Sequence, residues 1–229
     1  MPVRKKAPED LTAKKALALE VIRRLKAEYP DAGCTLDYDH AWQLLVSVRL
    51  AAQCTDARVN IVVEELFAKY PSVAALAAAE PEDIEAIVKP CGLGHSKARD
   101  ISACMRMLRD KYDCRVPNTF EELLALPGVG RKSANLIMGD VFGKPAIVTD
   151  THCIRLCNKI GLVDGIKEPQ KVEMALWKII PPEEGSDLCH RFMMHGRAVC
   201  NARKPECEKC CLKDICRTAR EAAGQQAEP

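Results

Sequence analysis

Four cysteines in one short segment constrain the fold of this 229-residue chain more than any other feature of its sequence. They are Cys200, Cys207, Cys210 and Cys216, with the spacing C-x6-C-x2-C-x5-C. Free cysteines are often buried in protein cores, but these four lie among Lys, Arg and Glu residues that favour solvent. The spacing therefore predicts that the four thiolates converge on one metal centre and fold a tight loop around it.

The spacing by itself is compatible with two kinds of metal centre, a zinc site and an iron–sulfur cluster. Structural zinc sites usually have two separated C-x-x-C pairs, whereas this segment has one, Cys207 to Cys210. Iron–sulfur clusters also take four cysteines, at wider and more varied gaps. The pattern favours an iron–sulfur cluster, and Cys211 is a further candidate ligand directly beside Cys210.

The chain has thirteen cysteines, yet its other features do not indicate a secreted disulfide scaffold. The sequence starts with Met-Pro-Val-Arg-Lys-Lys and continues with charged residues, so we expect no secretory signal. No apolar run is long enough for a membrane span. We therefore expect a cytoplasmic protein with reduced or metal-bound thiols and no membrane partner.

The net charge of +2 does not by itself indicate a nucleic-acid partner. The segment from His190 to Arg217 is locally basic, with seven Lys or Arg against three Asp or Glu. Such a segment can follow a phosphate backbone, and it can equally be a solvated face.

Apolar residues recur at helical spacing through almost the whole chain, which predicts an all-α fold. Residues 41–52 are apolar on nearly all sides, so we expect a buried central helix there. The one period-two stretch, Ala146 to Thr149, is too short to build a sheet. We expect residues 222–229 to be a frayed tail. Three apolar stripes are clear: Ala18, Ile22, Leu25 and Tyr29; Val59, Val62, Val63 and Leu66; Ile101, Met105, Leu108 and Tyr112.

A glycine-containing turn joins two of the predicted helices, 119–125 and 131–141. Pro127 ends the first helix, and Gly128 and Gly130 allow backbone conformations that are closed to other residues. With no side chains in the way, the amides of this turn and of the next helix can bind a phosphate together. An ordinary connection between helices uses the same residue types, so the glycines alone do not decide between the two.

Five motifs in register resemble those of the endonuclease III family. They are A-Q-C-T-D at 52–56, G-L-G-H-S-K-A at 92–98, L-P-G-V-G-R-K-S-A at 126–134, V-T-D-T-H at 148–152 and the cysteine spacing. The resemblance implies a helix-hairpin-helix at about 119–142 and a C-terminal loop that binds a four-iron, four-sulfur (4Fe-4S) cluster through the four cysteines. It further implies a monomer associated with the nucleoid, whose partner is double-stranded DNA containing damaged pyrimidines or abasic sites.

The activity implied by the resemblance is that of a bifunctional DNA glycosylase and abasic-site lyase in base excision repair. Lys132 would attack the sugar C1′ of an oxidised pyrimidine nucleotide, form a Schiff base and start β-elimination. Asp150 would stabilise the cationic sugar or accept a proton. Taken without the resemblance, Lys132 is an ordinary surface charge, and Asp150 is a helix N-cap, a role that is compatible with catalysis.

The family also implies residues that take the place of a base flipped out of the duplex. Gln53 would fill the vacated position and Leu93 would contact the opposite strand. Their ordinary alternatives are a polar residue at a helix end for Gln53 and loop packing for Leu93.

The resemblance implies two helical lobes. Residues 34–144 would form a helical barrel domain with the hairpin, and residues 1–33 with 145–229 would form the iron–sulfur domain. Two other functions stay open: a monofunctional mismatch glycosylase of the same superfamily, and a non-catalytic helix-hairpin-helix DNA-binding iron–sulfur protein. The presence of Lys132 argues against the first, and its pairing with Asp150 argues against the second.

Overall fold

The structure is a computed structural model that describes residues 11–225. These residues form twelve α-helices and three short 3-10 helices, with no strand among them, which confirms the predicted all-α class. Within the same residues, no helix is both long and apolar enough to cross a membrane. The chain divides into two compact units, one of residues 34–144 and one that joins the residues up to Gly33 to those from Pro145 onward. We call them the continuous unit and the split unit.

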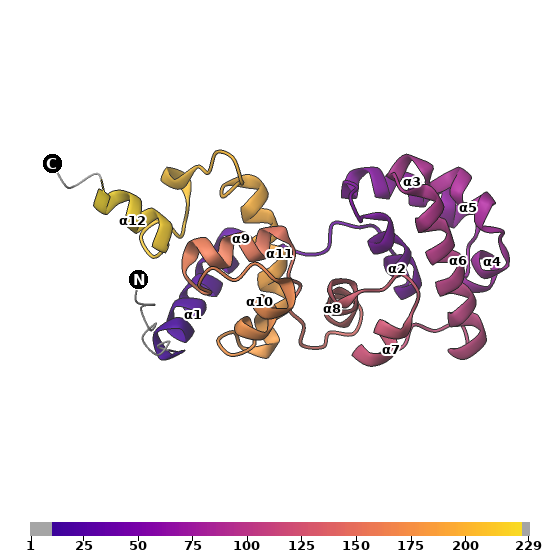
Figure 1. The fold of residues 1–229 in the computed structure, drawn as a ribbon, viewed down its shortest axis with the longest axis horizontal. Helices are drawn as coiled ribbons and strands as arrows, with labels where there is room; N and C mark the ends of the chain where they lie inside the picture. The colour runs from indigo at the N-terminus through magenta and orange to yellow at the C-terminus, as the bar shows by residue number, and fades with distance from the viewer. Residues whose placement is uncertain (1–10, 226–229) are drawn as a thin grey trace, which may run out of the picture. The chain divides into compact units, whose positions relative to one another are not determined.

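The continuous unit is built around the long helix α6 (Figure 1). Helices α4 and α5 pack against α6, and α2 packs against α3, α6 and α8. Its elements are α2 (Ala41–Leu50), α3 (Asp56–Lys69), α4 (Val73–Ala78), α5 (Pro81–Val88), the 3-10 helix η1 (Lys89–Cys91), α6 (Gly94–Lys111), α7 (Phe120–Ala125) and α8 (Arg131–Asp140).

Local sequence signals set the ends of these helices. The hydroxyls of Thr55, Ser72 and Thr119 each accept a hydrogen bond from a backbone amide in the first turn of α3, α4 and α7, as Ser and Thr do at N-caps. The predicted central helix is α2, which buries most of its side chains as expected and ends at Leu50. One hydrophobic core fills this unit, and Trp42 packs edge-to-face on Phe67 within it, at 5.1 Å between ring centres.

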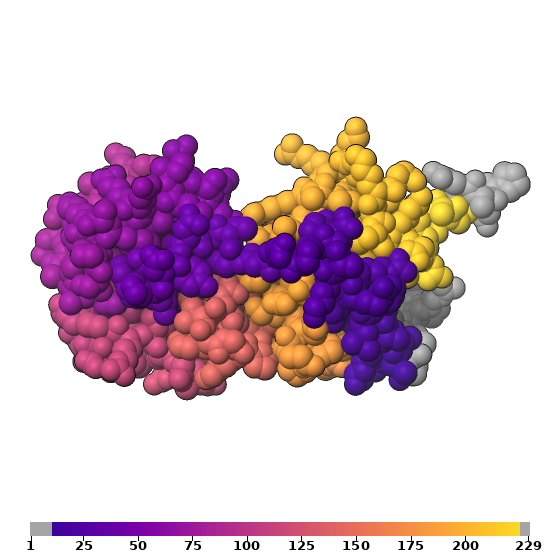
Figure 2. All heavy atoms as spheres, turned by 180° about the vertical axis from the view of Figure 1, so that it is seen from behind, coloured from indigo at the N-terminus to yellow at the C-terminus, as the bar shows by residue number. Residues whose placement is uncertain are grey.

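The split unit combines the first helix with the second half of the chain. Helix α1 buries the predicted stripe Ala18, Ile22 and Leu25 and packs against α11. Figure 2 shows α1, in indigo, lying on the orange and yellow atoms of this unit. The elements are α1 (Leu11–Glu28), α9 (Thr151–Ile160), α10 (Pro169–Leu176), η2 (Pro182–Glu184), α11 (Gly185–Ala198), η3 (Cys207–Lys209) and α12 (Arg217–Gln225).

Helix α12 corrects the prediction of a frayed tail over residues 222–229. The helix continues to Gln225, and residues 226–229 lie outside the described part of the chain. Its first turn is held in place, because the Arg217 guanidinium donates to the carbonyl of Asn158 at 2.7 Å and Thr218 Oγ1 donates to the carbonyl of Lys159 at 2.9 Å.

Candidate functional site

The turn between α7 and α8 requires glycine at one of its two glycine positions. Gly128 has φ +75°, and a Cβ added there would lie 2.8 Å from Cβ of Asp100 and 3.1 Å from Cδ of Arg49. Gly130 has φ −97° and ψ 177°, an extended conformation open to any residue, and a Cβ there would meet nothing within 4 Å. The expectation of special backbone freedom therefore holds for Gly128 and is wrong for Gly130.

Gly130 instead serves as the N-cap of α8. With no side chain, it makes no capping hydrogen bond, so the amides of the first helical turn stay open to an external acceptor. Such amides and the helix dipole together suit a phosphate. Lys132, the second residue of α8, is exposed, and within the continuous unit its amine forms no ion pair or hydrogen bond. The hairpin thus presents open amides and an accessible amine on consecutive residues.

Gln53 and Leu93 share an unusual backbone conformation. Both are exposed and have positive φ, 57° for Gln53 and 52° for Leu93. Among the described non-glycine residues, only Asp113 and Cys114 do the same. A left-handed conformation is unfavourable for a residue with a Cβ, more so for a bulky one, and such residues concentrate at functional sites. This conformation could not be predicted from the residue types, because neither residue is the Gly, Asn or Asp that usually adopts it.

Asp150 is the N-cap of α9, as its ordinary interpretation predicts. Its Oδ1 accepts a hydrogen bond from the backbone amide of Cys153 at 2.7 Å. The cap uses one carboxylate oxygen, Oδ1, and Oδ2 takes no part in it. The residues that lead into it, 146–149, are all buried, so the start of α9 is fixed in place. This arrangement is compatible with both roles considered for Asp150.

Three further cysteines of the split unit form part of its core. Cys153, Cys157 and Cys189 are buried, with 3.9 Å between the sulfurs of Cys153 and Cys157. A hydrogen bond to Cys157 and burial raise the pKa of Cys153 well above its ordinary value, so this thiol stays protonated. These residues act as small apolar side chains, which accounts for part of the high cysteine count.

The four cysteines predicted as ligands are neighbours in space. Burial is the main cause that raises the pKa of Cys200, and the negative charges of Cys216 and Cys207 add to it. Burial also raises the pKa of Cys210 to about 11, with smaller contributions from Cys200 and Cys216. Among the described residues, no group of three or more His, Cys, Asp or Glu is arranged to hold a single metal ion. The thiols therefore share one region of the split unit.

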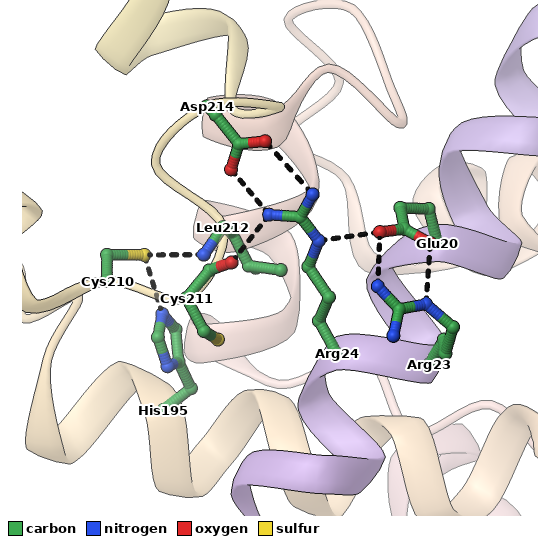
Figure 3. A network of polar contacts seen from close by, with 8 residues as sticks. All are labelled: Glu20, Arg23, Arg24, His195, Cys210, Cys211, Leu212 and Asp214. Atoms are coloured by element: carbon green, nitrogen blue, oxygen red, sulfur yellow. Dashed lines mark hydrogen bonds and ion pairs between the residues drawn. The ribbon is translucent and has the colours of Figure 1, made fainter.

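A backbone hydrogen bond from Leu212 opposes the effect of burial on Cys210 and lowers the pKa of its thiol. The amide of Leu212 lies 3.4 Å from the sulfur, and Nε2 of His195 lies 3.3 Å from it (Figure 3). Burial lowers the pKa of His195 to about 4, so its ring is neutral. The hydroxyl of Tyr29 lies 3.0 Å from Nδ1 of the same ring. The backbone amide aimed at the Cys210 sulfur favours the thiolate that iron binds, so these residues fit an iron–sulfur cluster.

Cys211 has a different environment from Cys210. Burial is the main cause that raises its pKa, and its charged neighbours are Glu28 and Arg24 of α1. Its carbonyl oxygen accepts a hydrogen bond from Arg24 at 2.9 Å, and the same guanidinium pairs with Asp214 (Figure 3). These contacts favour Cys210 over Cys211 as a ligand and give Cys211 a part in fastening the loop to α1.

The basic segment from His190 to Arg217 is less available to a phosphate backbone than its composition suggests. Ion pairs within the split unit hold four of its seven basic side chains. The pairs are Arg191 with Asp187, Lys209 with Glu206, Lys213 with Glu208 and Arg217 with Asp164.

One residue that the sequence analysis missed is Lys97 in the first turn of α6. It is 0% exposed, although lysine is seldom fully buried. Its Nζ donates to the carbonyl of Leu50 at 2.8 Å and to that of Cys91 at 2.9 Å. A signal was present, since Lys97 lies four residues before Ile101 and so continues the apolar stripe of that helix.

Comparison with known proteins gives a family. Residues 46–182, more than half of the chain, match the HhH-GPD superfamily base excision DNA repair protein family. The chain is 42% identical to the endonuclease III of Synechocystis sp. over 210 residues, 91% of this chain and 95% of that protein. It is 38% identical to the endonuclease III of Escherichia coli strain K12 over 202 residues, 88% and 95% of the two chains.

The fold agrees with a solved structure of the same kind. A trapped endonuclease III–DNA covalent intermediate is 39% identical and matches with a TM-score of 0.86, over 91% of this chain and 98% of that one. Sequence and structure are thus similar over nearly the full length of the relatives. The chain belongs to the endonuclease III family of HhH-GPD base excision DNA repair proteins.

Proposed function

We propose that this chain is a bifunctional DNA glycosylase and abasic-site lyase that removes oxidised pyrimidines from double-stranded DNA in base excision repair. The observation that carries the proposal is the hairpin, where an exposed lysine follows open amides at the N-terminus of α8. The amides would bind a backbone phosphate and so bring Lys132 to the sugar beside it. The full-length similarity to endonuclease III supports this activity over a mismatch glycosylase or a non-catalytic DNA-binding protein.

In the proposed reaction, the amine of Lys132 in its neutral form attacks C1′ as the bond from C1′ to the base breaks. The sugar ring opens to a Schiff base between C1′ and the lysine nitrogen. Loss of a proton from C2′ then breaks the bond between C3′ and the phosphate oxygen, and water releases the enzyme. The solved relative is a trapped covalent intermediate with DNA, which supports a covalent route for this chain.

Asp150 is proposed to act on the same nucleotide. Its carboxylate would accept a proton from the attacking amine or stabilise the positive charge that develops on the sugar. Because Oδ1 is held by the Cys153 amide, the carboxylate has a fixed orientation before substrate binds. Fixed charges stabilise a transition state without a reorganisation cost.

Gln53 and Leu93 are proposed to enter the DNA. A base in a duplex can be reached only after it leaves the stack, and side chains that fill the gap keep it out. Both residues hold exposed side chains on left-handed backbone, and that conformation is maintained only where the surrounding structure fixes it.

Cys200, Cys207, Cys210 and Cys216 are proposed to bind a 4Fe-4S cluster. Base excision and β-elimination need no electron transfer, so the cluster would supply a cross-link that stiffens the loop. Arg203 and Lys204 of that loop form no ion pair within the split unit and would be available to DNA phosphates. Metal and sulfide analysis of the purified protein checks this, since a cluster gives iron with acid-labile sulfide and a brown colour, whereas zinc gives neither.

Borohydride trapping tests the catalytic proposal. Incubation with duplex DNA containing thymine glycol or an abasic site, followed by borohydride, is expected to reduce the Schiff base and leave a covalent protein–DNA adduct. Lys132→Ala is expected to abolish the adduct. Lys111→Ala, which removes an exposed lysine at the far end of α6, is the matched control and should trap normally.

The other outcomes separate the alternatives. Base release without an adduct would indicate a monofunctional glycosylase, and no activity on any lesion would indicate a DNA-binding protein. Action on DNA further favours a cytoplasmic, nucleoid-associated location, which fluorescence microscopy of a tagged chain checks. The two compact units support the proposed division into a helix-hairpin-helix domain and a cluster domain.

A further inference from the structure

We infer that Lys97 is a positioning residue that ties together the two loops carrying Gln53 and Leu93, so that both side chains meet the DNA in register. The inference rests on the proposed function. Lys97 takes no part in the chemistry. Its side chain bonds two backbone carbonyls, one at the start of each of these two loops.

The two hydrogen bonds of Lys97 reach two different chain segments. Leu50 is the last residue of α2, three residues before Gln53, and Cys91 is the last residue of η1, two before Leu93. A carbonyl at a helix end lacks an intrahelical donor and needs another. One ammonium serves both ends at 2.8 and 2.9 Å, which fixes the distance between the starts of the two loops.

Burial of a lysine at this position is energetically unfavourable. Burial lowers the pKa of Lys97, because a charge is unfavourable away from water. The neighbouring positions on the same helix face, such as Ala98 and Ile101, are apolar, and an apolar residue would fill the space at a lower free-energy cost. An apolar residue could not, however, bond both carbonyls.

The same two loops are also close together at their cysteines. Burial raises the pKa of the Cys91 thiol to about 11, and the nearby Cys54 thiol, next to Gln53, adds to this rise. A residue in the left-handed conformation needs support from its surroundings, and these contacts supply it to both loops.

A third loop joins the network through Arg49, the neighbour of Leu50. Its guanidinium bonds Asp100 at 2.7 Å and Ser96 at 3.2 Å, both on α6. The Arg49 and Asp100 side chains are also the atoms that approach Gly128 of the hairpin. The turn after α2, the loop before α6 and the hairpin are thus supported by one set of contacts centred on the first two turns of α6.

The experiment compares one variant on two substrates. The first is duplex DNA with a base-paired oxidised pyrimidine, for which a base must be flipped out and the gap filled. The second is a single-stranded oligonucleotide with an abasic site, which has no base to flip and no opposite strand. Lys97→Met should lower excision from the duplex on the order of 100-fold, as misplacement of positioning groups does, while strand cleavage of the single-stranded substrate stays at the wild-type rate.

The matched control is Arg106→Met on the same helix. Arg106 also bonds two loop carbonyls, those of Ala77 and Ala79, but that loop carries no proposed DNA-contacting residue. This variant should keep wild-type rates on both substrates. Thermal melts of both variants by circular dichroism give the stability loss that each substitution causes.

Each outcome separates this inference from the proposed function. Equal losses on both substrates for Lys97→Met, or undiminished duplex excision, would overturn the positioning role. If Lys97→Met does not fold, Lys97→Gln decides by the same ratio of rates, since its shorter side chain keeps N–H donors but cannot span both carbonyls. A wild-type protein inactive on both substrates would instead reject the proposed function.

Discussion

The two units hold their proposed functional residues in different ways. In the continuous unit, these residues are positioned mainly by the backbone. Residues 53 and 93 are left-handed, a glycine turn lies at 128, and a buried lysine bonds two backbone carbonyls. In the split unit, side chains hold the cysteine loop through ion pairs and hydrogen bonds, such as Arg24 with Asp214 and His195 with Cys210. Backbone conformation thus positions the loops of the continuous unit, whereas contacts between side chains position the cysteine loop of the split unit.

The two units are therefore sensitive to different kinds of change. Exposed ion pairs contribute little to stability, about 0–1 kcal/mol each, so the cysteine loop depends on its proposed cluster. The continuous unit needs no cofactor, but it allows few substitutions where the backbone is unusual. Loss of metal should therefore affect the split unit, and a change of one glycine should affect the continuous unit.

The largest effect is expected from removal of a proposed cluster ligand. Cys216→Ser should abolish iron binding, and the loop from Cys200 to Cys216 should become sensitive to trypsin at Arg203. Cys211→Ser, which removes a neighbouring thiol that faces α1, should keep its iron. Iron content and limited proteolysis measure both variants. Loss of iron from Cys211→Ser would assign that residue as a ligand and remove the distinction between the two neighbouring cysteines.

A smaller effect is expected in the continuous unit from Gly128→Ala. The left-handed backbone and the approach of 2.8 Å to Asp100 both oppose a Cβ there, so the loss of stability should be about 2–4 kcal/mol. Gly130→Ala meets open space on extended backbone and should lose less than about 1 kcal/mol, as at an ordinary N-cap. Urea unfolding measures both. Equal losses would mean that the turn is not fixed by backbone conformation.

The smallest change in stability is expected at Asp150. Asp150→Ala removes the cap of α9 and should lower stability by about 1 kcal/mol, whereas Asp150→Asn keeps a capping oxygen and should be nearly neutral. Both should lose excision activity, because both remove the carboxylate charge. Melting temperatures and single-turnover rates separate the two roles. Full activity in Asp150→Asn would leave Asp150 as a cap alone.

Much of this molecule could be predicted from its sequence. Helical periodicity predicted the apolar stripes of α1, α3 and α6. Residue types at helix ends predicted the approximate bounds of α7 and α8 and the N-cap at Asp150. The family motifs covered the rest of the proposed site. The prediction for Gly130 was wrong because glycine occurs both at left-handed positions and at ordinary N-caps. The surrounding residues determine which of the two conformations a given glycine adopts.

Other features left no readable signal in the sequence. The left-handed conformation of Gln53 and Leu93 comes from tertiary contacts, since neither residue type favours it. The bonds of Lys97 are to backbone carbonyls, which every residue has, so the sequence cannot identify the partners. The pairing of Lys209 and Lys213 with nearby glutamates depends on the path of the loop around the cysteines.

The discontinuity of the split unit also has a consequence for biosynthesis. Helix α1 is made first, but its partners, α11 and the acids Asp164 and Asp214, come after the whole continuous unit. During translation the continuous unit can fold as its own segment leaves the ribosome, while the apolar stripe of α1 stays uncovered. The proposed cluster could be bound only once the second half has emerged, because all four of its proposed ligands lie there. The order of synthesis thus completes the hairpin before the cysteine loop, and α1 is the segment that chaperones would need to shield.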